Sequence, residues 1–265
     1  MSMTGFIGAG KMAEAIVRGI LRGGVLASTD VGIYDIQPSR VAELAGQVGV
    51  RPFASNVDIV KACDVIVLAV KPQDLDAVLS EIAGVAAGRC FMSIAAGRMV
   101  KGLEAALPGA RVVRVMPNLA CQVGAGMSVI CGGSLATKDD LATARRLFEA
   151  SGIVCEAPES HFDIVTAVSG SGPAFWTQLA EYQYKKAVSA GLTMDTARLL
   201  ILQTMLGTAK ILQETNQDFG SFMDAVASKG GTTAAGLDVL RNSEAASILT
   251  AVLDATAARS EALRR

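Results

Sequence analysis

Histidine is almost absent from this chain of 265 residues, which contains a single one, His161. One imidazole cannot build a histidine-rich metal site, and a catalytic triad would depend entirely on that side chain. The five cysteines are scattered and odd in number, and no two of them form a CxxC pair. This spacing argues against a disulfide framework or a zinc site, so we expect reduced thiols, most of them in the core. The sequence therefore predicts no bound metal.

Long hydrophobic runs are missing as well, although hydrophobic residues make up 51% of the chain. The longest strong run, residues 65–70, has the length of a strand, whereas a membrane-spanning helix needs about 20 apolar residues. No basic segment followed by an apolar one opens the chain, so no secretory signal is visible. Positive charge is not in excess either, since 24 Lys+Arg face 25 Asp+Glu, which argues against a duplex-binding face. We therefore expect a cytoplasmic protein without a membrane or nucleic-acid partner.

Strand and helix signals alternate in the first part of the chain. Short apolar or β-branched runs, which predict strands, occur at residues 5–7, 31–35, 64–70, 90–94, 111–115, 127–131 and 153–156. Helical stretches of about ten residues separate the earlier runs, a pattern typical of βαβ units in a mainly parallel sheet. We therefore predict an α/β fold whose N-terminal domain, residues 1–159, is a Rossmann-type doubly wound sheet.

Strand signals stop after His161, and helical periodicity takes over. The periodic stretches lie at residues 173–190, 194–214, 219–227 and 245–263. We therefore predict an all-helical C-terminal domain over residues 160–265.

A glycine-rich turn, residues 8–13, joins the first predicted strand to the first predicted helix. Its sequence, Gly-Ala-Gly-Lys-Met-Ala, is the G-x-G-x-x-A form of the dinucleotide-binding fingerprint. Gly8 permits the tight turn, Gly10 lets a pyrophosphate approach the backbone, and Ala13 keeps the helix close to the strand. The pyrophosphate would rest on the helix N-terminus, where N–H groups and the helix dipole favour an anion. An ordinary βα turn is the alternative interpretation.

Asp35 ends the second predicted strand, at the position that meets the adenosine ribose in such folds. A carboxylate there accepts hydrogen bonds from the ribose hydroxyls and repels a 2′-phosphate, which favours NADH over NADPH. Arg40 is the opposing feature, because its guanidinium can bind a phosphate. A simpler interpretation is that Asp35 only begins the turn before Pro38.

Two later strand ends also carry candidate site residues, since ligands bind at the carboxyl ends of strands in such sheets. Ala69, Lys71 and Pro72 are expected to line the cofactor, with Lys71 facing the cofactor or solvent rather than acting in catalysis. Asn118 follows the strand at 111–115. We predict that it donates a hydrogen bond to the substrate or to the nicotinamide ribose, with a simple turn residue as the alternative.

A second unusual cluster, residues 228–233, reads Ser-Lys-Gly-Gly-Thr-Thr and lies between two helical segments. We expect it to open a helix with Thr232 or Thr233 as the N-cap. Such a turn presents backbone N–H groups to an anion, so a substrate with a carboxylate is predicted. The alternative is an ordinary connection between helices. Small residues at 169–173 predict a further site of close packing, on the N-terminal domain or on a second subunit.

Five segments together resemble the pyrroline-5-carboxylate reductase family, with matching order and spacing along essentially the whole chain. They are FIGAGKM at 6–12, AVKPQ at 69–73, VMPN at 115–118, VSGSGPA at 168–174 and GGTT at 230–233. The resemblance implies reduction of the C=N bond of 1-pyrroline-5-carboxylate by NAD(P)H, which gives L-proline. It also implies that the helical domain interlocks with its mate in a homodimer, often assembled further into a decamer.

The resemblance implies roles for individual residues. The cofactor would be held by Gly8, Ala9, Gly10, Lys11, Met12, Asp35, Ala69, Lys71, Pro72 and Asn118. The substrate carboxylate would be bound by the N–H groups of Gly230, Gly231 and Thr232, while Thr233 bonds the ring nitrogen and Ser228 lies nearby. The segment Tyr182–Lys186 departs from the small, apolar pattern usual in the family, near the implied dimer interface.

The residue chemistry agrees with this implied reaction. A cyclic imine is basic enough to be protonated near neutral pH, so its reduction needs a positioned hydride donor and an anchor rather than a strong enzymic acid. Two other functions are possible on this fold. A β-hydroxyacid dehydrogenase would place a lysine shortly after the Gly-rich helix start, but the first lysine after Gly172 is Lys185. A non-catalytic NAD-binding regulator is disfavoured by the intact motif at 230–233.

Overall fold

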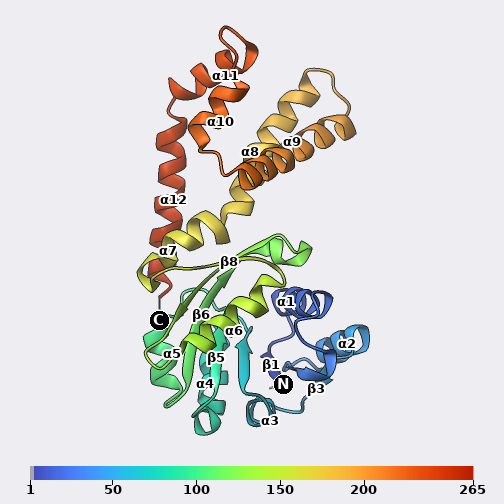
Figure 1. Ribbon diagram of the computed structural model, residues 1–265, viewed down its shortest axis with the longest axis vertical. Helices are drawn as coiled ribbons and strands as arrows, with labels where there is room; N and C mark the ends of the chain where they lie inside the picture. The colour runs from blue at the N-terminus through green and yellow to red at the C-terminus, as the bar shows by residue number, and fades with distance from the viewer. Residues whose placement is uncertain (1–2, 265) are drawn as a thin grey trace. The chain divides into compact units, whose positions relative to one another are not determined.

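The computed structural model describes residues 3–264, which form two compact units (Figure 1). The first unit contains the chain up to Ser171 together with the segment from Ala255 onward, and the second is Gly172–Asp254. The domain boundary between residues 159 and 160 stays a prediction. Residues 1, 2 and 265 of the predicted domains lie outside the described residues.

The first unit is built on one eight-stranded sheet with the order β3-β2-β1-β4-β5-β6-β7-β8. In chain order the strands are β1 (Thr4–Ile7), β2 (Val31–Tyr34), β3 (Arg51–Pro52), β4 (Val65–Leu68), β5 (Cys90–Ser93), β6 (Arg111–Pro117), β7 (Gly126–Gly132) and β8 (Gly152–Glu156). Every neighbouring pair is parallel except β6 and β7, which are antiparallel. The first six strands therefore have the Rossmann order, and the predicted mainly parallel sheet is confirmed.

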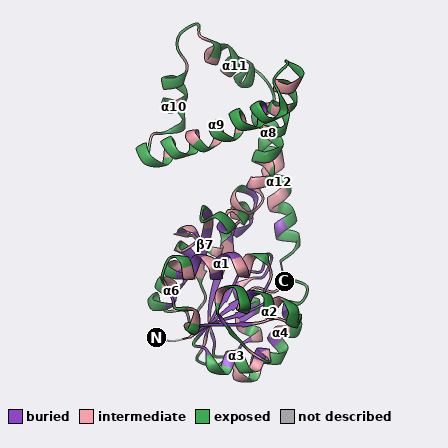
Figure 2. Cartoon of the chain, turned by 90° about the vertical axis from the view of Figure 1, so that its right-hand side faces the viewer, coloured by how far each residue is buried: buried purple, intermediate pink, exposed green. Residues whose placement is uncertain are grey.

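Helices cover both faces of this sheet. Buried apolar residues form two core clusters, one on each face. One cluster lies under α1 (Lys11–Arg22), α2 (Pro38–Val48) and α6 (Lys138–Glu149). The other lies under α3 (Asn56–Ala62), α4 (Leu75–Ile82) and α5 (Val100–Ala106). Within β1, Phe6 joins the first cluster and Ile7 the second, because successive side chains of a strand point to opposite faces. Figure 2 shows the resulting buried sheet. Burial on both faces explains why these strands are continuous apolar runs in the sequence.

Some short elements of the first unit were not predicted, among them β3, α7 and a π-helical segment. β3 has only two residues, one of them Pro52, so it carries no periodic signal and pairs at the edge of the sheet. The helical turn α7 (Phe162–Val165) leads into a π-helical segment, Thr166–Gly170. A Cβ at Gly170 would lie 2.6 Å from Met116 Cε. The small residues around 170 therefore serve close packing against β6, which is one of the two alternatives expected.

The second unit is entirely helical. It contains α8 (Gly172–Ser189), α9 (Met194–Thr215), α10 (Phe219–Val226), α11 (Thr232–Arg241) and the first part of α12 (Ala245–Ala262). Throughout Gly172–Asp254, all of which the structure describes, only Gly172 and Ala197 are buried. The predicted all-helical C-terminal architecture is confirmed.

Figure 2 shows that the helices of the second unit consist mostly of exposed residues. Many large apolar side chains of this unit are therefore exposed instead of forming a core. Among the most exposed are Trp176, Met194, Leu199, Leu206, Phe219 and Val239. A hollow of about 270 Å³ between α8 and α9 is lined by residues that include Tyr184, Ile201, Leu202 and Met205. A helical unit with this much exposed apolar surface needs a second surface to cover it. Across residues 3–264, no helix is both long enough and apolar enough to cross a membrane.

Candidate active site

The order of the strands reverses between β1 and β4, and the loops after these two strands meet. Ile7 of β1 is the register partner of Leu68 of β4, so both strands end at the same level. Gly8 has a φ of +102°, and a Cβ there would lie 2.7 Å from the carbonyl carbon and oxygen of Ala69. Only glycine fits such a contact. The sequence-predicted residues Gly8 and Ala69 are thus brought together at the sheet edge where Rossmann folds bind their ligands.

The N-terminus of α1 is open at Gly10. Gly10 is the N-cap, and no side chain caps the helix, so the first-turn N–H groups lack an intrahelical acceptor. A Cβ built at Gly10 meets no atom within 4 Å, whereas Ala13, one turn later, is fully buried. The residues therefore fit a pyrophosphate, which needs open space at a helix start that is held close to the sheet.

Asp35 lies at the end of β2 and binds the glycine-rich loop. Its Oδ2 accepts the N–H of Ala9 at 2.7 Å, and its Oδ1 accepts the N–H of Gln37 at 2.8 Å. The carboxylate therefore begins the turn, as the simpler interpretation held, and also fixes the loop after β1. The half-buried group remains at the position from which a carboxylate reads the ribose.

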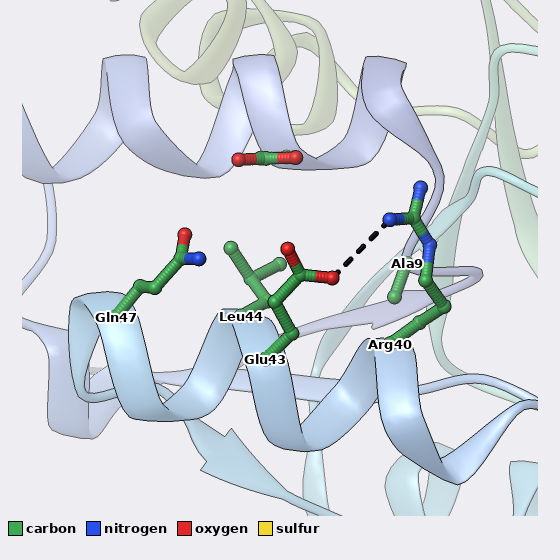
Figure 3. A pocket seen from close by; sticks show the side chains of 6 residues that line it. Ala9, Arg40, Glu43, Leu44 and Gln47 are labelled. Atoms are coloured by element: carbon green, nitrogen blue, oxygen red, sulfur yellow. Dashed lines mark hydrogen bonds and ion pairs between the residues drawn. The ribbon is translucent and has the colours of Figure 1, made fainter.

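Arg40, the residue whose guanidinium could favour NADPH over NADH, lines a small hollow beside Ala9 (Figure 3). Arg40 reaches Glu43 there, with 3.3 Å between Nη1 and Oε2. Glu14, on the same hollow, forms its own ion pair with Arg18 at 2.8 Å. Two carboxylates therefore share the surroundings of the Arg40 guanidinium.

The loop after β4 is exposed at Lys71 and Pro72. The Lys71 carbonyl accepts the N–H of Asp74 at 3.0 Å, and α4 begins at Leu75, three residues after Pro72. The Pro72 carbonyl accepts a hydrogen bond from Arg98 at 2.9 Å. Sequence reasoning missed Arg98, and its only signal is a charged residue just after the small-residue run that follows β5.

Asn118 follows β6 and is fully engaged with protein groups. Its Oδ1 accepts the N–H groups of Ala120 at 3.2 Å and Met127 at 3.1 Å. Its Nδ2 donates to the carbonyl and the hydroxyl of Ser169 at 3.3 and 3.4 Å. The amide therefore caps the next turn and ties β6 to the Ser-Gly-Ser segment. These contacts favour the turn-residue alternative, while its role toward cofactor or substrate stays a prediction.

The cluster at 228–233 lies in the second unit and forms a tight turn. Gly230 has a φ of +69°, and the Gly231 N–H donates to the Ser228 carbonyl at 2.9 Å. The N-cap of α11 is Gly231, so the expectation that Thr232 or Thr233 caps the helix is wrong. A Cβ at Gly231 would collide with the Ser228 hydroxyl, which explains why glycine takes the cap position.

This cap leaves the start of α11 open. No side chain caps the helix, so the N–H groups of Thr232 and Thr233 lack an intrahelical acceptor. The implied use of the Gly231 N–H by a substrate is at odds with its hydrogen bond in the turn. Ser228, Gly230 and Thr232 are exposed and Thr233 is half-buried.

Three thiols of the first unit, those of Cys63, Cys121 and Cys131, are poor nucleophiles. Burial raises the pKa of Cys63 to about 11 and that of Cys131 to about 12, with nearby Asp64 and Glu159 carboxylates adding to these effects. Burial also raises the pKa of Cys121, which lies in the turn after Asn118. These side chains therefore stay protonated near neutral pH, and the candidate site has no thiolate chemistry at these positions.

Comparison with known proteins decides the family. A reductase from Methanosarcina acetivorans, named pyrroline-5-carboxylate reductase, is 40% identical over 259 residues, which cover 97% of this chain and 95% of the relative. The chain belongs to the pyrroline-5-carboxylate reductase family. The family model for pyrroline-5-carboxylate reductase dimerisation matches residues 159–263, and a model described as NADP oxidoreductase, coenzyme F420-dependent, matches residues 3–97.

Solved structures agree with this family membership. A pyrroline-5-carboxylate reductase from Coxiella burnetii superposes with a TM-score of 0.95 at 30% identity, covering 100% of this chain and 99% of the other. The Plasmodium falciparum pyrroline carboxylate reductase, solved with NADP bound, gives 0.88 at 28% identity and covers 100% and 98% of the two chains.

Family membership confirms the function and the enzyme class that the sequence predicted. This family member is an NAD(P)-dependent oxidoreductase, a pyrroline-5-carboxylate reductase. Its dimerisation domain implies a homodimer, in agreement with the exposed apolar surface of the second unit. The β-hydroxyacid dehydrogenase and the non-catalytic regulator, which were the two alternatives, are therefore set aside.

Proposed function

We propose that the chain reduces the C=N bond of 1-pyrroline-5-carboxylate to give L-proline, and that the turn at 228–233 anchors the substrate carboxylate. The observation that carries this proposal is the open start of α11, where Gly230 and Gly231 shape a turn and no side chain caps the helix. A helix N-terminus of this kind favours an anion through its N–H groups and its dipole.

Each residue of the turn has a role in this proposal. The N–H groups of Gly230 and Thr232 bind the carboxylate, and Gly231 shapes the turn through its hydrogen bond to Ser228. The Thr233 hydroxyl bonds the ring nitrogen and holds it in one orientation. The substrate enters as the iminium, whose C=N electron pair becomes the nitrogen lone pair on reduction while the proton stays on nitrogen. Thr233 and water then relay protons with solvent.

The loops of the first unit hold the cofactor in this proposal. NAD(P)H supplies the hydride that reduces the imine carbon. The residues from Gly8 to Met12 bind its pyrophosphate, while Ala69, Lys71 and Pro72 line it and Asn118 borders the nicotinamide end. Asp35 accepts hydrogen bonds from the adenosine ribose, and its charge disfavours a 2′-phosphate. NADH is therefore the proposed preferred cofactor, supported by the Arg40–Glu43 ion pair.

The assembly follows from the second unit. We place the dimer contact on the exposed apolar faces of α8 and α9, with further association of dimers into a decamer. Tyr184, in the segment that departs from the family pattern, lines the hollow between these helices and would face the mate. The proposed location is the cytoplasm.

Initial rates test the proposal directly. Oxidation of NADH and of NADPH is followed with 1-pyrroline-5-carboxylate and, in parallel, with the six-membered ring analogue. We expect turnover with the five-membered imine, a higher kcat/KM with NADH than with NADPH, and accumulation of L-proline. Cofactor binding without oxidation in the presence of the imine would contradict the proposal.

A further inference from the structure

Arg98 is a nearly buried cation that joins two loops at the carboxyl edge of the sheet. It lies between β5 and α5, and only 9% of its side chain is exposed. Its Nη2 donates to the Pro72 carbonyl at 2.9 Å and lies 2.6 Å from Oδ2 of Asp76. A guanidinium is rarely buried to this extent without a specific use, because its desolvation is costly.

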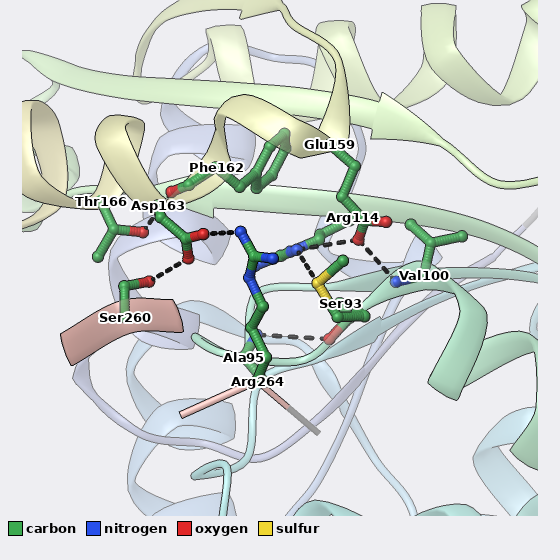
Figure 4. A network of polar contacts seen from close by, with 11 residues as sticks. Ser93, Ala95, Val100, Arg114, Glu159, Phe162, Asp163, Thr166, Ser260 and Arg264 are labelled. Atoms are coloured by element: carbon green, nitrogen blue, oxygen red, sulfur yellow. Dashed lines mark hydrogen bonds and ion pairs between the residues drawn. The ribbon is translucent and has the colours of Figure 1, made fainter. Parts of the chain in front are cut away.

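The loop that carries Arg98 is itself fixed from two sides. A Cβ at Gly97 would lie 2.7 Å from the Leu263 carbonyl, so the loop touches the end of the chain closely. At the start of α5, the Val100 N–H donates to Oε1 of Glu159 at 2.7 Å. The same Oε1 accepts from Nη1 of the buried Arg114 at 2.9 Å (Figure 4).

Contacts of Asp163 fix the C-terminal segment that lies against the Arg98 loop. Asp163 accepts the Ser260 hydroxyl at 2.8 Å through Oδ1, and its Oδ2 forms an ion pair with Arg264 (Figure 4). The C-terminal segment that touches Gly97 is therefore anchored by its own polar contacts. Arg98 extends from a rigid support.

The loop at residues 71–74, which Arg98 contacts, is exposed and has few contacts of its own. Lys71, Pro72, Gln73 and Asp74 are all exposed, and the hydrogen bond between the Asp74 N–H and the Lys71 carbonyl is local to their own turn. The guanidinium, by contrast, reaches this loop from a position 26 residues away in the chain. It contacts the backbone of Pro72 and the first turn of α4 at Asp76.

We propose that Arg98 is a positioning residue for the cofactor: it holds the Lys71–Pro72 loop in its binding geometry before the cofactor arrives. The inference rests on the proposed function, since it takes this loop to line the cofactor. A loop that is already ordered loses less conformational entropy on binding, so its ligand binds more tightly. A charge-assisted hydrogen bond to a backbone carbonyl is among the stronger means of fixing a loop.

The test measures NADH binding to the full-length protein by calorimetry, together with steady-state kinetics. Arg98→Met is expected to raise the Kd and KM for NADH about fivefold, with kcat at saturating NADH within about twofold of wild type. Arg98→Lys keeps a donor for the Pro72 carbonyl and is expected to recover part of the affinity.

Arg89→Met is the matched control. Arg89 precedes β5 as Arg98 follows it, and it also contacts one carboxylate, Asp64 at 2.7 Å, and one backbone carbonyl, Lys61 at 3.2 Å. Its loss is expected to leave the Kd for NADH within about twofold of wild type. An unchanged Kd in Arg98→Met, or an equal rise in Arg89→Met, would overturn the inference. If Arg98→Met does not fold, Arg98→Gln, whose shorter side chain cannot span both contacts, takes its place, and an unchanged Kd in that variant overturns the inference as well.

A third variant separates this inference from the proposed function. Gly10→Ala places a methyl group in the open space at the start of α1 and is expected to weaken NADH binding directly. If Gly10→Ala binds NADH as wild type does, the proposed cofactor-binding site at the start of α1 is wrong. If Gly10→Ala weakens binding and Arg98→Met does not, only the role of Arg98 is wrong.

Discussion

The backbone N–H of Ala9 donates to Oδ2 of Asp35 at 2.7 Å. This bond joins the loop after β1 to the end of β2, so the carboxylate proposed to read the ribose also shapes the pyrophosphate turn. Its second oxygen accepts the Gln37 N–H at 2.8 Å. In the proposed function, cofactor choice and the order of the loop therefore depend on the same side chain.

Asp35→Asn tests this double role. The asparagine side chain keeps one oxygen that can accept a hydrogen bond from the loop. It lacks the negative charge that repels a 2′-phosphate. We expect the ratio of kcat/KM for NADPH to that for NADH to rise about tenfold, with a small loss of thermal stability. Initial rates with both cofactors measure the ratio, and an unchanged ratio removes Asp35 from cofactor selection.

Gly8 and Gly10 are predicted to respond differently to the same methyl group. Gly8→Ala puts a Cβ 2.7 Å from the Ala69 backbone at a φ of +102°. We therefore expect the free energy of unfolding to fall by about 2–3 kcal/mol. Gly10→Ala meets no atom and has an ordinary φ of −72°, so its melting temperature should stay near that of wild type. Thermal denaturation of the two variants checks this contrast, and similar melting temperatures would contradict it.

Thr233→Ala should slow turnover without abolishing it. Removing one hydrogen bond to the ring nitrogen costs about 1–3 kcal/mol, which corresponds to a roughly ten- to hundredfold loss of kcat/KM. Thr233→Ser keeps the hydroxyl and should retain most of the activity. Wild-type rates in Thr233→Ala would remove this role, and equal losses in both variants would assign the effect to the methyl group instead.

The exposed apolar face of α9 is predicted to hold the dimer together. Leu199, Leu202 and Leu206 are spaced along one face of that helix and are 68%, 48% and 51% exposed. A charge in such a contact opposes association, so Leu202→Glu should convert the oligomer to the mass of a single chain. Leu135→Glu, at a leucine that is 53% exposed in the first unit, is the matched control. Light scattering after size exclusion gives both masses, and an unchanged mass for Leu202→Glu would remove α9 from the interface.

Asp140 is predicted to make stability depend on pH. Burial opposes its charge, but hydrogen bonds from Thr137 and from Arg111 outweigh this and lower the pKa of the carboxyl below its ordinary value. The folded pKa is below the unfolded one, so the stabilisation is complete above about pH 4 and is lost as the pH falls through the folded pKa. The difference in melting temperature between wild type and Asp140→Asn should therefore shrink between pH 6 and pH 3. A difference that does not change with pH would contradict this account.

Local sequence signals were sufficient for much of the fold. The apolar runs that became β1, β4 and β5 are buried on both faces of the sheet, so their burial is visible in the sequence itself. Pro38 marks the start of α2, as expected for a residue with a fixed φ at a helix N-terminus. The fingerprint at 8–13 placed the turn at the correct strand end.

Long-range contacts explain what the sequence did not reveal. Arg98 contacts Pro72, 26 residues away, and Asp163 binds Ser260, 97 residues away, so no periodicity or local motif connects either pair. The cap of α11 was misplaced because threonine and glycine are about equally acceptable at an N-cap, so residue type alone does not choose between them. The close approach of Ser228 to Gly231 favours glycine at that position.

Deuterium transfer from cofactor to product tests the central claim most directly. The enzyme is supplied with 1-pyrroline-5-carboxylate and NADH labelled with deuterium at the transferred position of C4, and the product is analysed by mass spectrometry and NMR. The account predicts L-proline with one deuterium on the former imine carbon for each NADH oxidised. Oxidation of the labelled cofactor without deuterated L-proline would contradict it.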